Sequence, residues 1–114
     1  MHEVGIICSM LDTIRGIMRE ENLTHVEKIV LEVGELSGVV PKYMEDCFPA
    51  AIYKTEFQNT KMEMIVIPGM VRCEKCGMEF NGYRYDLTCP NCSESTHLTR
   101  LSGEGLTIKE IHAC

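Results

Sequence analysis

The sequence predicts an α+β fold in which two helices lie on a three-stranded β-sheet, with a cysteine-rich domain inserted before the last strand. Three observations predict it. Two segments have helical periodicity, three have the alternation of strands, and the stretch before the third strand has turn residues, few aliphatic residues and four cysteines. The predicted domains are therefore an α/β domain of residues 1–68 plus 103–114 and an inserted domain of residues 69–102.

The two helices are expected at residues 4–21 and 41–56. Pro41 suits the first turn of the second helix, and Pro49 should kink that helix because proline lacks the N–H of a helical hydrogen bond. Apolar residues recur every three or four positions in both segments. The stripe of the first helix comprises Val4, Ile7, Leu11, Ile14 and Met18. The core side of the second comprises Met44, Cys47, Phe48, Ala51 and Ile52.

The three strands are expected at residues 25–36, 60–67 and 105–111. Ile29, Leu31 and Val33 alternate with more polar positions in the first strand, and Pro68-Gly69 ends the second. The inserted domain thus lies between two strands that can pair at its base.

Composition excludes several classes of protein. The chain has 114 residues and a net charge of −6, and no segment is basic, so nucleic-acid binding is not expected. No apolar run approaches the roughly 20 residues that span a bilayer, and the N-terminus does not resemble a signal peptide, so we expect a cytoplasmic protein without membrane contact. No nucleophile is placed beside a base, so no catalytic residue is predicted and an enzyme is not expected.

Two C-x-x-C pairs separated by 12 residues carry the strongest signal, namely Cys73 with Cys76 and Cys89 with Cys92. Such pairs form a closed tetrahedron of four thiolates, the usual structural zinc site, in a zinc-ribbon-like domain. The intervening stretch, with Phe80, is expected to form a small hairpin. The spacing does not separate zinc from iron. A rubredoxin-like electron carrier and a zinc-ribbon adaptor protein therefore stay open as alternatives.

The N-terminus Met1-His2-Glu3 is a second candidate ligand set. The α-amine of Met1, the backbone nitrogen of His2 and its imidazole can chelate one ion in fused rings, which suits Ni(II) or Cu(II). The backbone nitrogen or the carboxylate of Glu3 can complete or orient the set. Taken alone, the same residues also fit a frayed terminus with an incidental histidine.

The other histidines and cysteines are expected to have ordinary roles. Cys8 and Cys47 lie on or near apolar helix faces and are expected to be buried. His97 is expected to be a solvated loop residue. His112 and Cys114 are two residues apart, but the end of a chain is usually mobile.

The joint pattern along the chain resembles the HypA family of hydrogenase maturation factors, the nickel metallochaperones. It consists of Met1-His2-Glu3 opening a helix, the segment Val33-Gly34-Glu35-Leu36-Ser37-Gly38-Val39 after the first strand, and the two C-x-x-C pairs before a final strand. The order covers the whole chain, and the combination is far more specific than the cysteine pairs alone.

The resemblance implies a nickel-binding domain of two helices and three strands joined to a zinc domain. His2 is then the key nickel ligand, with the Met1 amine and the backbone around Glu3 contributing. Ni(II) is a transient cargo and Zn(II) a structural ion held by Cys73, Cys76, Cys89 and Cys92. The implied partners are a nickel-handling GTPase and the large subunit of [NiFe]-hydrogenase, and some relatives also serve urease. The sequence leaves open whether the chain is a monomer or a homodimer.

Overall fold

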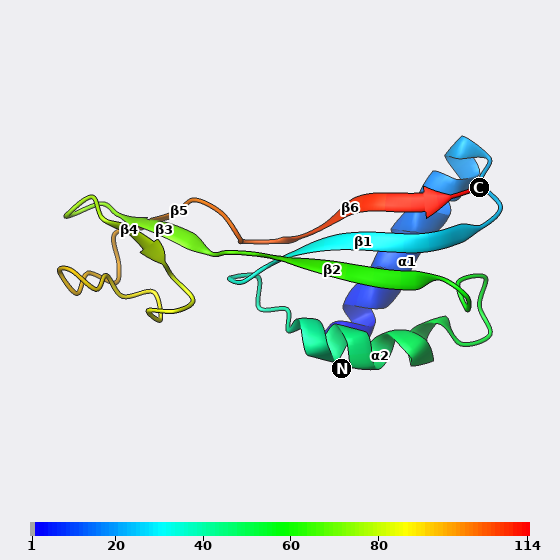
Figure 1. Cartoon of the computed structure of the whole chain (residues 1–114), viewed down its shortest axis with the longest axis horizontal. Coiled ribbons are helices and arrows are strands. Elements are labelled where there is room, and N and C mark those ends of the chain that lie inside the picture. The colour runs from blue at the N-terminus through cyan, green and yellow to red at the C-terminus, as the bar shows by residue number, and fades with distance from the viewer. Residues whose placement is uncertain (1) are drawn as a thin grey trace. The chain divides into compact units, whose positions relative to one another are not determined.

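The computed structural model describes residues 2–114 and, for His2, the backbone alone. It has the α+β fold that the sequence predicts. Along the chain the elements are α1 (His2–Glu21), β1 (Val26–Gly34), α2 (Pro41–Ile52), β2 (Lys61–Ile67), β3 (Met70–Cys73), β4 (Glu79–Asn81), β5 (Leu98–Arg100) and β6 (Leu106–Ala113) (Figure 1). Neither helix of the described chain is long and apolar enough to cross a membrane.

Contacts divide the chain into two compact units. The first comprises Met1–Leu31, Val40–Met64 and Ile108–Cys114, and the second comprises Glu32–Val39 and Ile65–Thr107. The second unit thus includes the ends of β1 and β2 and the start of β6, beside the inserted stretch. Whether residues 69–102 fold as a domain of their own stays a prediction, because a division by contacts does not measure independent folding.

The larger sheet has the strand order β2-β1-β6 (Figure 1). The first two of these strands run in the same direction, since Thr60 Oγ1 donates to Val26 O at 2.7 Å near their starts and Glu35 N donates to Ile67 O at 3.0 Å near their ends. A parallel pair needs a crossover connection, which α2 provides. In contrast, β6 is antiparallel to β1. The C-terminal end of β6 lies beside the start of β1, where Cys114 N donates to His25 O at 2.9 Å.

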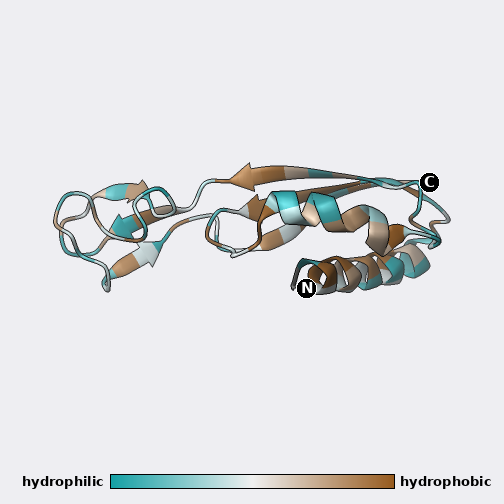
Figure 2. Cartoon of the chain, turned by 90° about the horizontal axis from the view of Figure 1, so that it is seen from below, coloured by the Kyte–Doolittle hydropathy of each residue, from teal (hydrophilic) through white to brown (hydrophobic). Residues whose placement is uncertain are grey.

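Both helices lie on one face of this sheet (Figure 2), and the predicted apolar faces form the core there. Ile7, Leu11 and Ile14 of α1 are no more than 2% exposed. All of the side chains expected on the core side of α2 are buried except Ala51, which is half-buried. The central strand β1 is buried more completely than its alternation suggested, since Val30 is also only 1% exposed.

The second helix ends at Ile52, four residues before the predicted end. Thr55 stops it locally, because its N–H and hydroxyl both bond to Ile52 O, at 3.0 and 2.7 Å. The chain then turns through Lys54, which has φ +58°, and places Phe57 in the core with no exposed surface. If the helix continued, its period of about 3.6 residues would fix the direction of the Phe57 side chain. The ring is buried only after the chain turns, so its burial favours a helix that ends at Ile52.

The smaller sheet, of order β4-β3-β5, lies within the second unit. Val71 of the central strand is paired with Phe80 on one side and Arg100 on the other. The hairpin of β3 and β4 therefore encloses the first cysteine pair. The predicted hairpin lay between the two cysteine pairs, but residues 82–88 of that stretch form turns. The fully buried core of this unit is small and consists of Val71, Cys73, Phe80 and Cys89, with Leu36, Leu87 and Leu98 packed against it.

Candidate metal centre

The first cysteine pair lies in the tight turn that links β3 to β4. Cys73 ends β3, its N–H donates to Met78 O at 2.8 Å, and its carbonyl accepts from Gly77 N at 2.8 Å. Gly77 has φ +80°, the left-handed conformation that glycine adopts without a Cβ penalty. These bonds turn the chain sharply enough for both thiols of the pair to face one point.

The second pair repeats this turn outside any strand. Cys89 N donates to Glu94 O and Ser93 N donates to Cys89 O, both at 2.9 Å. Ser93 occupies the place that Gly77 has in the first turn, and it too is left-handed, with φ +65°. The two halves of the site are therefore equivalent in backbone hydrogen bonding, although one of them holds a serine in a conformation that favours glycine.

Replacing Ser93 with glycine is expected to stabilise the second turn. The left-handed conformation costs a side-chain-bearing residue roughly 1–2 kcal/mol. Part of the gain is lost to the greater entropy of glycine in the unfolded chain, so we expect a net gain of about 0.5 kcal/mol. The measurement is denaturant unfolding of the zinc-loaded protein. The matched control is Ser95→Gly, at a serine without a positive φ, which should not stabilise. Equal effects of the two substitutions would contradict this explanation.

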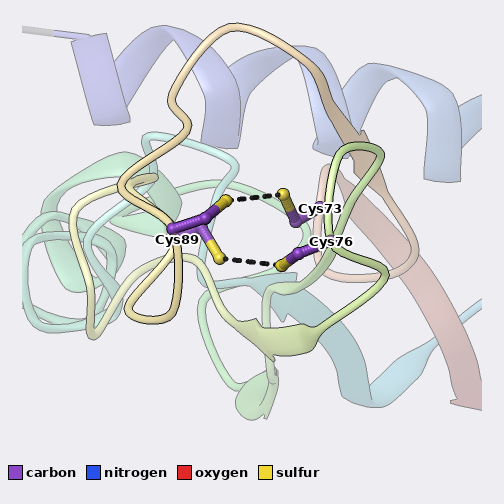
Figure 3. A group of neighbouring side chains, drawn as sticks. Cys73, Cys76 and Cys89 are labelled. Carbon is purple, nitrogen blue, oxygen red and sulfur yellow. Dashed lines mark hydrogen bonds between the residues drawn. The ribbon is translucent and has the colours of Figure 1, made fainter.

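The four cysteine sulfurs lie close together, as Figure 3 shows for the labelled Cys73, Cys76 and Cys89. All four Sγ atoms are within 4.8 Å of one another, and the shortest pairs, Cys73 with Cys92 and Cys76 with Cys89, are 3.5 Å apart. Zinc–thiolate bonds of ~2.3 Å in a tetrahedron place the sulfurs about 3.8 Å apart. The donor set therefore fits a four-thiolate ion, and it leaves no coordination position for a substrate.

Hydrogen bonds around the sulfurs favour different protonation states. The Asn91 side chain and the Met78 amide donate to Cys76 and lower the pKa of this thiol to about 6. The Glu94 amide likewise favours the Cys92 thiolate, but bonds with the neighbouring thiols and local desolvation outweigh it and raise the pKa of Cys92 to about 12. Metal binding must therefore displace protons, as it does at thiolate sites in general. The sequence reasoning had not identified Asn91, whose residue type carries no ligand signal.

The two halves of each pair differ in exposure. Cys73 and Cys89, the first cysteine of each pair, are no more than 1% exposed and belong to the small core, whereas Cys76 and Cys92 are exposed. One side of the sulfur cluster therefore belongs to the small core, and the other side is exposed to solvent. Half of the fully buried residues in this core are predicted metal ligands, so loss of a bound ion would be expected to disturb the core.

His97 is a solvated loop residue, as expected. Its side chain is 64% exposed, and its Nδ1 lies 3.1 Å from Glu94 Oε2. The Glu94 carboxylate also accepts from the Thr96 hydroxyl at 2.6 Å and the Thr96 amide at 2.8 Å, and it pairs with Lys75 at 3.1 Å. These donors, Thr96 first, hold the pKa of Glu94 well below its usual range. The carboxylate therefore organises the loop that follows the second cysteine pair.

The segment after β1, which contributed to the family resemblance, supports the metal centre. Glu35 Oε1 accepts from Asn81 Nδ2 at 2.8 Å and from Gly69 N at 3.0 Å, and these bonds lower the pKa of the Glu35 carboxyl. The next residue, Leu36, packs against the core that contains Cys73 and Cys89. The sequence pointed to this segment without a role for Glu35, because its partners are distant along the chain.

Replacing Gly34 with alanine is expected to destabilise this unit. A Cβ at Gly34 would overlap the carbonyl oxygen of Gly103, and this backbone atom cannot rotate away. Overpacking of this kind costs about 1–3 kcal/mol. Denaturant unfolding measures the loss, and Gly105→Ala is the control, since a Cβ there meets nothing within 4 Å. Equal stability of the two variants would show that the close approach has no energetic weight.

The proposed nickel ligands fall at the edge of the described chain. Met1 and the side chain of His2 lie outside it, so their ligand geometry stays a prediction. His2 is the first residue of α1, and Glu3 is half-buried in the first turn.

The two helix cysteines outside the four-cysteine site differ in burial. Cys47 is buried as predicted, whereas Cys8 is exposed, so the prediction for Cys8 was wrong. Cys8 follows the buried Ile7 and lies just outside the apolar stripe.

Comparisons with known proteins identify the family of this chain and agree with its fold. The profile of the HypA family, described as hydrogenase/urease nickel incorporation metallochaperone, matches residues 1–113. A hydrogenase maturation factor HypA from Rhodopseudomonas palustris is 32% identical over 111 residues, which cover 97% of both chains. One from Prosthecochloris aestuarii is 35% identical, also over 97% of both chains.

Solved structures show the same fold. The solution structure of the nickel metallochaperone HypA from Helicobacter pylori matches with a TM-score of 0.68 at 13% identity, covering 97% of this chain and 96% of that one. The match extends over both parts of the chain, and it agrees with the sequence profile and with the curated relatives. The chain therefore belongs to the HypA family of nickel metallochaperones, the hydrogenase maturation factors.

Proposed function

We propose that this chain binds Ni(II) at its N-terminus and delivers it for the maturation of [NiFe]-hydrogenase. The observation that carries the proposal is membership of the HypA family over residues 1–113. The ligands in this proposal are the α-amine of Met1, the backbone nitrogen and imidazole of His2, and the backbone or carboxylate of Glu3. Nickel is the cargo, and no residue is assigned a catalytic role.

The start of α1 supports such a site. The helix begins at His2, and the first four N–H groups of any helix lack an acceptor within it. Ni(II) can displace the proton of an amide nitrogen. Coordination by the backbone nitrogens of His2 and Glu3 therefore breaks no N–H bond of the helix, and unwinding the first residues to reach a planar geometry costs little.

The positive charge of Ni(II) is unfavourable at a helix N-terminus, and deprotonated amide ligands offset this charge. The N-terminus of a helix carries a partial positive charge of roughly half a unit, which disfavours a bare cation. Each amide that loses its proton to bind nickel contributes a negative charge. Glu3, in the first turn of α1, adds a carboxylate nearby. A nickel site built from backbone anions is thus compatible with a helix terminus, and protonation at low pH should empty it.

This arrangement suits transfer. The ligands belong to a few residues at one end of the chain, so they can leave the ion one after another without unfolding the core. The imidazole titrates near neutrality, with a reference pKa of about 6.5, so acidification competes with nickel. The proposed recipients are a nickel-handling GTPase and the hydrogenase large subunit, acting in the cytoplasm. Urease is a second client that the family description includes.

The four-cysteine site is proposed to hold Zn(II) as a structural ion. The sulfur separations fit a tetrahedral ion, and four thiolates leave no position for chemistry on a substrate. The same sulfurs would also accept iron, which the rubredoxin-like alternative requires. Family membership favours zinc and metal delivery over electron transfer or an adaptor role. Purified protein should accordingly be colourless, whereas ferric thiolate is red.

The test of nickel delivery uses the untagged full chain, loaded with zinc. Calorimetric titration with Ni(II) is expected to give one site per chain. Adding a single glycine before Met1 converts the α-amine into an amide. We expect nickel binding to weaken on the order of 100-fold, because loss of a direct ligand should cost at least as much as loss of a group that only orients a ligand. Zinc content and helicity should not change. Unaltered affinity in the extended chain would exclude the amine as a ligand.

A further inference from the structure

Two segments carry the chain into and out of the cysteine-rich stretch, and both bond to the residues that follow β1. On the entering side, Glu35 N donates to Ile67 O at 3.0 Å. On the leaving side, Leu36 N donates to Gly103 O at 2.8 Å. The backbone after β1 therefore joins the two ends of the inserted stretch, although it is more than 30 residues away from either cysteine pair along the chain.

The Glu35 side chain closes the open end of the hairpin formed by β3 and β4. The first cysteine turn joins these two strands at one end, and at the other end Gly69 precedes β3 and Asn81 ends β4. Glu35 Oε1 accepts from Gly69 N at 3.0 Å and from Asn81 Nδ2 at 2.8 Å. Hairpins as short as this one are marginally stable by themselves. One carboxylate oxygen thus holds the two strands together opposite the first cysteine pair.

Asn81 extends this constraint to the second cysteine pair. Its side-chain oxygen accepts from Arg84 N at 2.8 Å, and its backbone carbonyl accepts from Tyr85 N at 3.2 Å. These bonds begin the turns of residues 82–88, which lead directly into Cys89. The residue that the carboxylate holds is therefore also the one that starts the path to the second pair.

The charge of Glu35 suits this role. The hydrogen bonds from Asn81 and Gly69 lower the pKa of the Glu35 carboxyl, so the group is ionised at neutral pH. Hydrogen bonds to an ionised acceptor are stronger than those between neutral groups. Among the described residues no cation is paired with Glu35, and its side chain is half-buried. The negative charge therefore strengthens the bonds to two neutral donors.

We propose that Glu35 is a positioning residue of the four-cysteine centre, and that it slows the release of the ion bound there. An ion can leave four thiolates only when the two cysteine pairs separate, and Glu35 holds chain segments that lead to both pairs. The inference rests on the proposal that these cysteines hold Zn(II). It assigns no ligand to Glu35, whose effect on the ion passes through Asn81 and the backbone of Gly69.

Zinc release from the full chain to an excess of a chromogenic chelator, without oxygen, measures this role. Glu35→Ala removes both hydrogen bonds and is expected to speed release on the order of 10-fold, the lower end of the range for loss of a group that orients a metal ligand. Glu35→Gln keeps the Oε1 acceptor and loses only the charge. It should therefore restore most of the effect and release zinc no more than about 3-fold faster than the parent.

Glu32→Ala is the matched control for these variants. Glu32 is a half-buried glutamate of β1, and among the described residues it forms no side-chain hydrogen bond or ion pair. This variant should release zinc at the parent rate. Loss of zinc from Glu35→Ala during purification counts as the expected result only if Glu35→Gln retains zinc.

A double-mutant cycle with Asn81→Ala separates positioning from a general loss of stability. Because Glu35 acts partly through Asn81, Glu35→Ala should speed release less in the Asn81→Ala chain than in the parent. Independent effects of the two substitutions, equal release from Glu35→Ala and Glu32→Ala, or no restoration by Glu35→Gln would overturn the role of Glu35 alone. A parent chain that binds no zinc would overturn the zinc assignment itself, and this inference with it.

Discussion

If the four cysteines hold zinc as proposed, replacement of Cys73 by serine is expected to release that ion and to unfold the four-cysteine unit. Cys73 is fully buried, ends β3 and lies 3.5 Å from Cys92 through its sulfur. A structural zinc ion contributes an apparent ~10–16 kcal/mol to folding in small zinc domains. That is comparable to the typical stability of about 5–15 kcal/mol for an entire domain, so a core as small as this one cannot compensate for its loss.

Zinc analysis and a two-dimensional NMR spectrum of the full chain would measure this effect. The expected result is loss of bound zinc and collapse of the amide dispersion of residues 70–100, while the signals of α1 and α2 persist because their core is separate. Cys47→Ala is the matched control, since Cys47 is also a buried cysteine but belongs to the other unit. It should retain zinc. A Cys73→Ser protein with full zinc and an unchanged spectrum would show that the ion does not support the fold.

Replacement of His2 by alanine is expected to abolish stoichiometric nickel binding and to leave zinc content and fold unchanged. In the proposed site the imidazole is the only side-chain nitrogen, and it closes the chelate ring with the backbone nitrogen of the same residue. Its loss removes a ligand and a ring together, so the nickel affinity should fall by more than about 100-fold, beyond the range for loss of an outer-shell partner.

Calorimetry of the untagged variant provides the measurement. His97→Ala is the matched control, because this histidine lies in the other unit and its exposed side chain bonds to the nearby Glu94 and Thr96. It should bind nickel as the parent does. Glu3→Gln separates a carboxylate ligand from a backbone ligand, since only the former is lost. If the His2→Ala chain binds nickel with the parent affinity, the site lies elsewhere and the delivery proposal loses its ligand set.

Much of the fold could be predicted because its signals are local. The apolar periodicity of α1, the alternation in β1 and the prolines at 41 and 68 act on neighbouring residues, and the corresponding elements formed where expected. The early end of α2 could not be predicted in this way. The chain turns at Lys54 and buries the Phe57 ring completely, and helical periodicity carries no information about the space that this ring fills.

The same contrast between local and long-range signals applies to the candidate metal centre. Two C-x-x-C pairs specify a four-thiolate site from spacing alone, because each pair must turn tightly for both sulfurs to reach one ion. The sequence does not indicate that Ser93 takes the left-handed conformation of Gly77, or that Asn91 donates to Cys76. These features depend on the path of the loop, which no short spacing encodes.

The sequence by itself identified the family and the four cysteines of the candidate site, and it predicted the order of the two helices and of the strands of the larger sheet. These depend on residue types, local periodicity and short spacings. Only the tertiary structure brought Glu35 to Asn81, closed the backbone of Gly34 on Gly103, and placed Cys114 beside Glu27. Each of these contacts joins residues more than 40 positions apart. Such pairs meet because strands and turns are packed by burial of distant apolar side chains, and no local pattern records which polar groups that packing will bring together.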